Sequence, residues 1–188
     1  MKILAVQSRM GIGDTVIFLP FIKALSKKFN SPISILVKEN SKANQYLHQT
    51  KYIDKILTLE RDNKTNNRHG GFFGIFKLAN DLKKYKFDKI FIFNSSLRFN
   101  LVAKISGIPQ IYQYPLFAKN KQHIIEAPKK FLKENLDLDI NEDPEVQIDN
   151  DSISKAAQKF QIDKNTTNIL LGIGGSGPTK RIPAKTFL

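Results

Sequence analysis

The sequence predicts an α/β fold in which a parallel sheet carries helices on both faces, followed by the beginning of a second unit. Two observations predict this fold class. Short apolar runs typical of buried strands alternate with segments whose apolar residues recur at helical spacing. The connections between them are short and carry Gly, Pro, Asn or Ser at the breaks, as in folds where a helix links successive parallel strands.

The first half of the chain contains three of these predicted strands. An apolar strand over residues 2–8 leads through a Gly-containing turn to a helix that begins at Asp14 and runs to about Phe29. Further along come a strand over 33–37, a polar helix over 41–49 and a strand over 55–59. Residues 60–71 show no apolar period, which predicts a mobile loop.

The second half continues the alternation. A helix is expected over 72–82, and it is followed by a strand over 88–94, a helix over 96–106, a strand over 108–114 and a helix over 123–135. The acidic segment 136–144 is expected to be a solvated linker, which puts one domain at 1–145 and a second, incomplete one at 146–188. That second domain is expected to hold strands over 146–148 and 168–173 around a helix over 152–160.

The composition indicates a folded protein and excludes several classes. Of the 188 residues 41% are hydrophobic, and the 14 Phe are spread along the chain, which excludes a disordered or collagen-like protein. The absence of Cys excludes a disulfide scaffold and a Cys nucleophile. No stretch approaches the roughly 20 apolar residues of a membrane span, and the first apolar run is too short for a signal peptide, so we expect a cytoplasmic protein.

The net charge of +13 has two interpretations: compositional drift, because Lys, Asn and Ile are all abundant, which explains much of it, and attraction to an anionic partner. A phosphorylated substrate or an anionic membrane face would satisfy it, and we expect peripheral contact with such a membrane. No RNA-binding signature or dense block of Arg and Lys accompanies the charge, so no nucleic acid partner is expected.

The first loop with a candidate chemical role follows the first strand. Gly11 and Gly13 would let the backbone approach a ligand closely, and Asp14 would stand at the head of a helix. Asp14 has two interpretations, a helix N-cap or a general base that takes a proton from an acceptor hydroxyl. A third interpretation is dinucleotide binding, because residues 11–16 nearly match G-x-G-x-x-G and Glu39 ends the second strand.

The second such loop lies near the C-terminus, over residues 172–183. Its glycines offer backbone amides that can form an anion nest, and its hydroxyl and cationic side chains add donors and charge. Together they predict a site for a phosphate or diphosphate, and the candidates are Gly175, Ser176, Gly177, Thr179 and Lys180.

Taken together, the two loops resemble glycosyltransferase family 9, the ADP-heptose:lipopolysaccharide heptosyltransferases. The resembling residues are Gly13-Asp14, Leu19-Pro20 and Ala24-Leu25 at the front, and 174–183 (GGSGPTKRIP) near the end. The likeness spans the whole chain but only the amino-terminal half of a normal family member. It departs at Ile182, where the family commonly has Trp, and this leaves the donor sugar open.

The resemblance implies a GT-B fold, in which two Rossmann-like domains face each other across a cleft. It further implies inverting, metal-independent transfer of a heptose or related sugar from an ADP-activated donor to a lipopolysaccharide core acceptor, without a cofactor. Asp14 would be the catalytic base, and Ser176 and Lys180 would meet the donor diphosphate. The acceptor would be held by Gly11, Gly13, Arg61, Lys64 and Arg68, the last three on the loop after the third strand.

Two other functions remain open at this point: an NAD(P)-dependent oxidoreductase domain and a non-catalytic module that binds an anionic glycan. The three His, at positions 48, 69 and 123, are too far apart in sequence for metal-ligand spacing. The last predicted helix would stop about one turn after it begins, so we expect a chain that is incomplete and by itself weakly active or inactive.

Overall fold

The computed structural model describes residues 1–8, 11–61, 67–116, 123–163, 165–170 and 184–186. The chain divides into two compact units, Met1–Ile148 and Asp149–Leu188. The domain boundary that the sequence predicts, between residues 145 and 146, stays a prediction.

A five-stranded, all-parallel sheet forms the centre of the first unit. Its strands are β1 (Ile3–Val6), β2 (Ile33–Lys38), β3 (Ile53–Leu59), β4 (Lys89–Ile92) and β5 (Gln110–Gln113), in the order β3-β2-β1-β4-β5. Ile3 in the middle strand lies beside Ile33 of β2 on one side and Lys89 of β4 on the other. The α/β fold class predicted from the alternating pattern is therefore confirmed.

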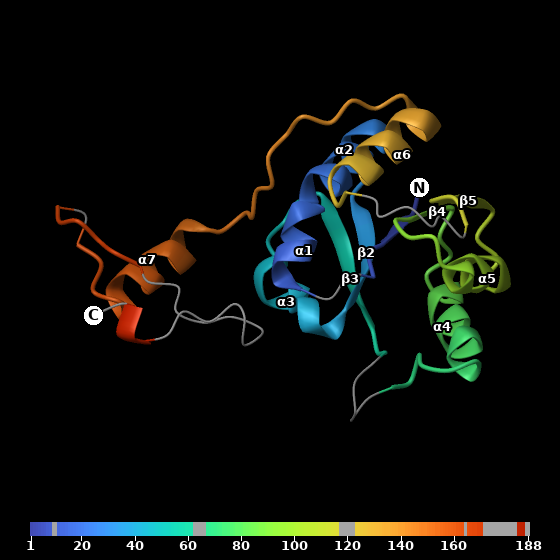
Figure 1. Cartoon of the computed structure of the whole chain (residues 1–188), viewed down its shortest axis with the longest axis horizontal. Helices are drawn as coiled ribbons and strands as arrows, with labels where there is room; N and C mark the ends of the chain where they lie inside the picture. Colours follow the sequence, from blue (N-terminus) through green and yellow to red (C-terminus); the bar gives the residue numbers. More distant parts are fainter. Residues whose placement is uncertain (9–10, 62–66, 117–122, 164, 171–183, 187–188) are drawn as a thin grey trace. The chain divides into compact units, whose positions relative to one another are not determined.

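Helices cover both faces of this sheet (Figure 1). One face carries α1 (Ile12–Ile17), α2 (Leu19–Phe29), α3 (Ala43–Tyr46) and α6 (Glu126–Leu136), and the other carries α4 (Phe73–Lys83) and α5 (Leu97–Ile105). In β1, Ile3 and Ala5 enter the first core and Leu4 and Val6 enter the second. A strand buried on both faces must be apolar throughout, which is why β1 reads ILAV without alternation.

The first predicted helix is interrupted. It begins at Ile12, with Gly11 rather than Asp14 as its N-cap, and α1 ends at Ile17 before α2 begins at Leu19. Pro20 has no N–H, and its ring would clash with the carbonyl four residues earlier, so one continuous helix cannot pass through it. The predicted polar helix over 41–49 is likewise shorter, a 3₁₀ turn η1 (Glu39–Ser41) followed by α3.

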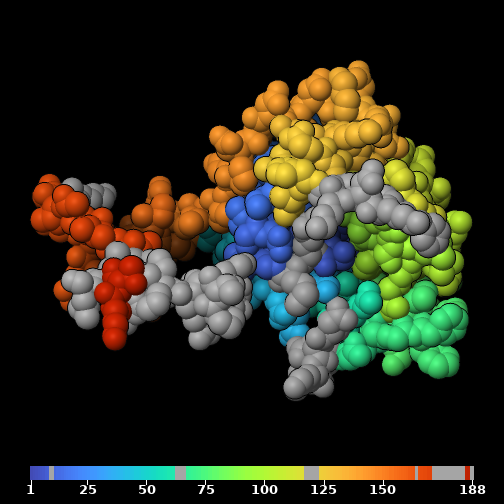
Figure 2. Space-filling model, in the orientation of Figure 1, coloured from blue at the N-terminus to red at the C-terminus, as the bar shows by residue number. Residues whose placement is uncertain are grey.

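The acidic segment after α6 is not the solvated linker that its composition predicts. Ile140 is buried in the first core, and Glu142 pairs with Lys23 at 3.1 Å and also with Lys27 on α2. The carboxylates of Asp137 and Asp139 both bind Lys133 of α6. The segment is therefore fastened along the first unit, and Figure 2 shows it in orange at the top of the molecule.

The second unit is described only in part. Helix α7 (Asn150–Lys159) is capped by the Asp149 carboxylate, which accepts from the Ser152 N–H at 2.6 Å, and a 3₁₀ turn η3 covers Ala184–Thr186. The predicted strand over 146–148 is wrong, and the described part of the predicted strand over 168–173 is not a strand. Within the described residues, no helix combines the length and the apolar composition that crossing a membrane requires.

The packing of Phe91 yields a stability prediction. The Phe91 side chain is fully buried, and its ring stacks on Tyr112 with centroids 4.6 Å apart. Phe91→Ala is expected to lower the free energy of unfolding by about 3–5 kcal/mol, because it removes a large buried side chain and leaves a cavity. Urea denaturation measures this change.

The matched control is Phe73→Ala, because the Phe73 side chain is 76% exposed. We expect it to change the free energy of unfolding by less than about 0.5 kcal/mol. Equal effects of the two substitutions would contradict the described packing.

Candidate functional site

The carboxyl ends of the parallel strands meet at one edge of the sheet, and ligands of such folds bind along this edge. It is termed the carboxyl edge below. Two of the predicted groups follow strands at this edge. Gly11, Gly13 and Asp14 follow β1, and Arg61 and Arg68 follow β3.

Asp14 occupies the third position of α1, where its carboxylate reaches back to the start of the helix. Its Oδ2 accepts the backbone N–H of Gly11 at 3.0 Å. Asp14 therefore caps the helix from inside rather than as the N-cap residue that one sequence interpretation expects. The residue is half-buried, and within the described part of the chain its Oδ1 has no partner. One carboxylate oxygen is thus fixed to the start of the helix.

Neighbouring side chains hold the backbone around Asp14. Gln7, buried at the end of β1, donates its side-chain amide to the Asp14 carbonyl at 3.2 Å. The Thr15 hydroxyl donates to the Gly11 carbonyl at 3.1 Å. A Cβ on Gly11 would lie 3.2 Å from the Asp14 carboxylate, whereas one on Gly13 would meet no heavy atom within 4 Å. Gly11 thus permits the close approach of the carboxylate, and Gly13 leaves the start of the helix uncovered.

A polar hollow of about 590 Å³ opens at the carboxyl edge beside η1, which packs against α1. It is lined by side chains that follow β2 and by the end of β3, among them Lys38, Asn40, Lys42, Asn44 and Glu60. Sequence analysis missed these residues as site candidates. The signal that could have found them is the polar run over 38–45 directly after a buried strand, which places donors and acceptors at the edge where ligands bind.

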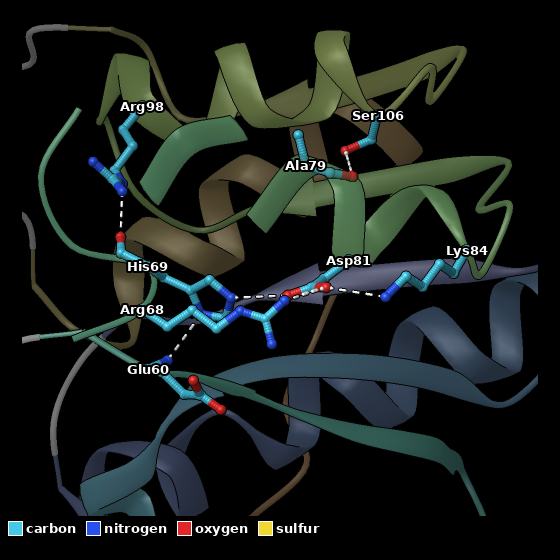
Figure 3. A network of polar contacts seen from close by, with 8 residues as sticks. All are labelled: Glu60, Arg68, His69, Ala79, Asp81, Lys84, Arg98 and Ser106. Carbon is cyan, nitrogen blue, oxygen red and sulfur yellow. Dashed lines mark hydrogen bonds and ion pairs between the residues drawn. The ribbon is translucent and has the colours of Figure 1, made fainter. Parts of the chain in front are cut away.

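The loop between β3 and α4 is closed at its base by Glu60 and His69 (Figure 3). The His69 N–H donates to the Glu60 carbonyl at 2.8 Å, and the Glu60 N–H donates to His69 Nδ1 at 3.1 Å. Because Nδ1 accepts, the ring proton lies on Nε2, which faces Asp81 Oδ2 at 3.1 Å. The described end of this loop is therefore tied to α4, contrary to the prediction that all of 60–71 is mobile. Arg61 and Arg68 lie next to its two closing residues.

Asp81 on α4 is the centre of this polar network. It binds His69, Arg68 at 2.8 Å and Lys84 at 3.3 Å. Burial alone would raise the pKa of the Asp81 carboxyl, but the hydrogen bonds from His69 and Lys84 and the charges of Arg68 and Lys84 outweigh it and hold the pKa below its usual value. Asp81 is therefore ionised at neutral pH, and it holds Arg68 and His69 in place.

Arg98, at the start of α5, fixes the other side of the loop. It donates to the Gly71 carbonyl at 2.8 Å and to the His69 carbonyl. Gly74 makes this approach possible, because a Cβ there would lie 2.3 Å from the His69 backbone. Contacts from α4 and α5 therefore hold residues 69–71 in place, and the chain enters α4 in one fixed orientation.

The remaining predicted site residues lie outside the described residues. They are Lys64, on the loop after β3, and the five candidates of the second loop, Gly175, Ser176, Gly177, Thr179 and Lys180. No group of His, Asp and Glu that could hold a metal ion is found in the described part of the chain.

The sequence matches no protein-family model and no curated protein. Three solved structures are similar to the chain over 99%, 87% and 76% of its length. The glycosyl transferase family 9 protein from Veillonella parvula superposes with a TM-score of 0.76 over 99% of this chain, at 19% identity. E. coli ADP-heptose lps heptosyltransferase II superposes with a TM-score of 0.60 over 87% of it, at 16% identity. An E. coli heptosyltransferase with ADP-2-deoxy-2-fluoro heptose reaches a TM-score of 0.50 over 76%, at 11% identity.

These likenesses confirm the predicted resemblance at the level of the fold. The chain covers 57%, 52% and 50% of the three solved chains, so it spans about half the length of the structures that it matches.

The network around Asp81 makes the stability of the first unit depend on pH. The folded-state pKa of Asp81 is lowered, so its stabilisation is complete above the unfolded-state pKa of about 3.9 and is lost as the pH falls through the folded-state value. Asp81→Asn is expected to lower the free energy of unfolding by about 1.5–3 kcal/mol at pH 7, which is the usual contribution of hydrogen bonds to a charged group. Urea denaturation at pH 7 and pH 3 measures both values.

We expect the difference between wild type and Asp81→Asn to shrink at the lower pH. Asp143→Asn, at an exposed carboxylate, serves as control and should leave stability at both pH values nearly unchanged. If the free energies of unfolding of wild type and Asp81→Asn differed by the same amount at pH 7 and pH 3, this would contradict the role given to the ionised Asp81.

Proposed function

We propose that this chain forms the acceptor-binding part of a glycosyltransferase that transfers a sugar from a nucleotide-activated donor. One observation carries the proposal: the half-buried Asp14 carboxylate stands at the carboxyl edge with Oδ2 bound to the Gly11 N–H and Oδ1 unpartnered among the described residues. The fold shared with a family 9 glycosyltransferase supports it. Because the chain spans about half of that structure, the activity is proposed for the complete protein.

In this mechanism Asp14 is the general base. An acceptor hydroxyl attacks the anomeric carbon of the donor, its proton passes to Oδ1 of Asp14, and the bond from the anomeric carbon to the diphosphate breaks. A base in this position contributes typically about 10²–10⁴ in rate. Attack from the face opposite the leaving group inverts the anomeric configuration. The bond between Oδ2 and Gly11 fixes the carboxylate, so little orientational freedom is lost when the acceptor binds.

For the acceptor we propose an anionic sugar of the lipopolysaccharide core, held between the polar hollow beside η1 and the base of the β3–α4 loop. The hollow offers amide and ammonium donors that suit sugar hydroxyls and carboxylates, with Lys42 and Asn44 among them. Arg68 keeps half of its side chain exposed while bound to Asp81. Arg61 and Lys64 belong to the same loop, and we assign them to acceptor binding with Arg68.

For the donor we propose an ADP-sugar, with heptose as the first candidate. One E. coli heptosyltransferase of the same fold has been solved with ADP and with ADP-2-deoxy-2-fluoro heptose. We assign Gly175, Ser176, Gly177, Thr179 and Lys180 to the diphosphate, because a glycine-rich loop with a lysine supplies amides and charge for the leaving group. The proposed reaction needs no metal or cofactor, since these groups supply the charge stabilisation.

The geometry of the first loop argues against the dinucleotide interpretation. A pyrophosphate on the start of α1 would need the Gly11 N–H, which the Asp14 carboxylate already occupies, and it would face that negative charge. Val16, at the position of the third glycine, packs into the first core. Neither feature suits a pyrophosphate at this helix.

Asp14→Asn separates the two roles of this residue, because an amide oxygen can still accept the Gly11 N–H but the side chain cannot take a proton. We expect transfer to fall by about 10²–10⁴ while the thermal midpoint and the affinity for the ADP-sugar stay close to wild type. The assay uses the protein expressed from its complete reading frame, with calorimetry for ADP-sugar and for NAD.

Asp54→Asn is the matched control, because Asp54 lies at the start of β3, away from the carboxyl edge. It should leave transfer unchanged. If Asp14→Asn turned over within a few-fold of wild type, Asp14 would be a helix cap and not the general base. Binding of NAD in place of ADP-sugar would overturn the proposed function.

A further inference from the structure

Three aromatic side chains at the beginning of α4 point away from the core. Phe72, Phe73 and Phe76 are 70%, 76% and 44% exposed, and they are termed the Phe patch below. Their rings touch one another, with the Phe72 centroid 6.0 Å from that of Phe73 and 5.7 Å from that of Phe76. The buried face of α4 is formed by Ile75, Leu78, Ala79 and Leu82 instead.

The Phe patch is held in a defined position. Arg98 binds the carbonyl of Gly71, the residue directly before Phe72, and the His69–Asp81 contact ties the preceding turn to α4. Gly71 itself adopts a φ of +59°, which a residue with a side chain rarely does. The rings therefore project from a braced turn, and α4 lies at the surface, in green at the lower right of Figure 2.

The part of the chain that carries the patch is basic. Residues 67–105, which include α4 and α5, contain eight Lys and Arg and only two acidic residues, Asp81 and Asp88. Of these cations, Arg68, Lys77 and Arg98 belong to the same end of α4 and α5 as the patch. Both acids are engaged, Asp81 by Arg68, His69 and Lys84 and Asp88 by the Lys2 N–H. Lys77, next to Phe76, is exposed and has no ion-pair partner among the described residues. Among the described residues, Lys77 is therefore a cation beside the patch that no acidic side chain compensates.

The patch also lies on the functional side of the sheet. It follows β3 through the β3–α4 loop, so it stands at the carboxyl edge, as Asp14 does after β1. A surface that engages it would lie along the edge at which the proposed acceptor binds.

We propose that the Phe patch is a docking surface for a membrane that contains anionic lipids. Aromatic rings that enter the interface, flanked by lysine and arginine near the headgroups, are the combination that holds a protein on such a membrane without crossing it. A second copy of this chain fits less well, because it carries the same net charge of +13. The proposal stands apart from the proposed function, since binding to lipid needs neither donor nor acceptor.

The test is co-sedimentation of the protein, expressed from its complete reading frame, with phosphatidylcholine vesicles containing or lacking phosphatidylglycerol. We expect the protein to bind the anionic vesicles, and we expect high salt to weaken this binding. The double variant Phe72→Ser/Phe73→Ser should weaken it at least about tenfold, and Lys77→Glu should weaken it by a smaller factor. The control Phe160→Ser, at a Phe that is 68% exposed on the second unit, should leave binding unchanged.

Several outcomes would overturn the proposal. Equal binding of the double variant and wild type would remove the role of the rings, and equal binding to both kinds of vesicle would remove the role of charge. A marked fall in the thermal midpoint of the double variant would show that another part of the protein covers the patch. A change from dimer to monomer in light scattering would assign it to a second copy, and loss of binding to RNA rather than to vesicles would assign it to nucleic acid.

Discussion

The middle strand β1 is buried on both faces and paired on both edges, and the placement of the polar groups at the carboxyl edge depends on this constraint. Its residues enter the two cores alternately, Ile3 and Ala5 on one side and Leu4 and Val6 on the other. Because β2 and β4 both pair with it in parallel, the segments that leave these strands emerge at the same edge. Burial of apolar area by the sheet and its helices thus determines where the ligand-binding groups gather.

At that edge the protein fixes its polar groups with bonds to backbone. Asp14 is held by the Gly11 N–H, and the turn before α4 is held by Glu60, His69 and Arg98. Carboxylates anchored in this way lose little further freedom when a substrate arrives, which is the usual basis of preorganisation at an active site. The same bracing of residues 69–71 presents the three exposed rings, so one local network supports both the loop of the proposed acceptor site and the proposed membrane surface.

Much of the fold followed from the sequence, because the strands of a parallel sheet are uniformly apolar and the helices between them are periodic. What could not be predicted depends on contacts between distant segments. The burial of Ile140 and the pairing of Glu142 with Lys23 require α2 to lie beside the segment after α6, a fact that an acidic composition conceals. The role of His69 depends in the same way on Asp81, which comes from a different element. Asp14 was identified as a candidate from spacing, but its place inside α1 rather than before it was set by the start of the helix at Ile12.

The proposed reaction is a single displacement, in which Asp14 deprotonates the acceptor while the bond to the diphosphate breaks on the opposite side of the sugar. The anomeric configuration of the first-formed product, read from its proton NMR spectrum with the α-linked and β-linked glycosides as references, tests this proposal most directly. We expect a product of inverted configuration. A product that retains the configuration of the donor would require two displacements and would contradict it.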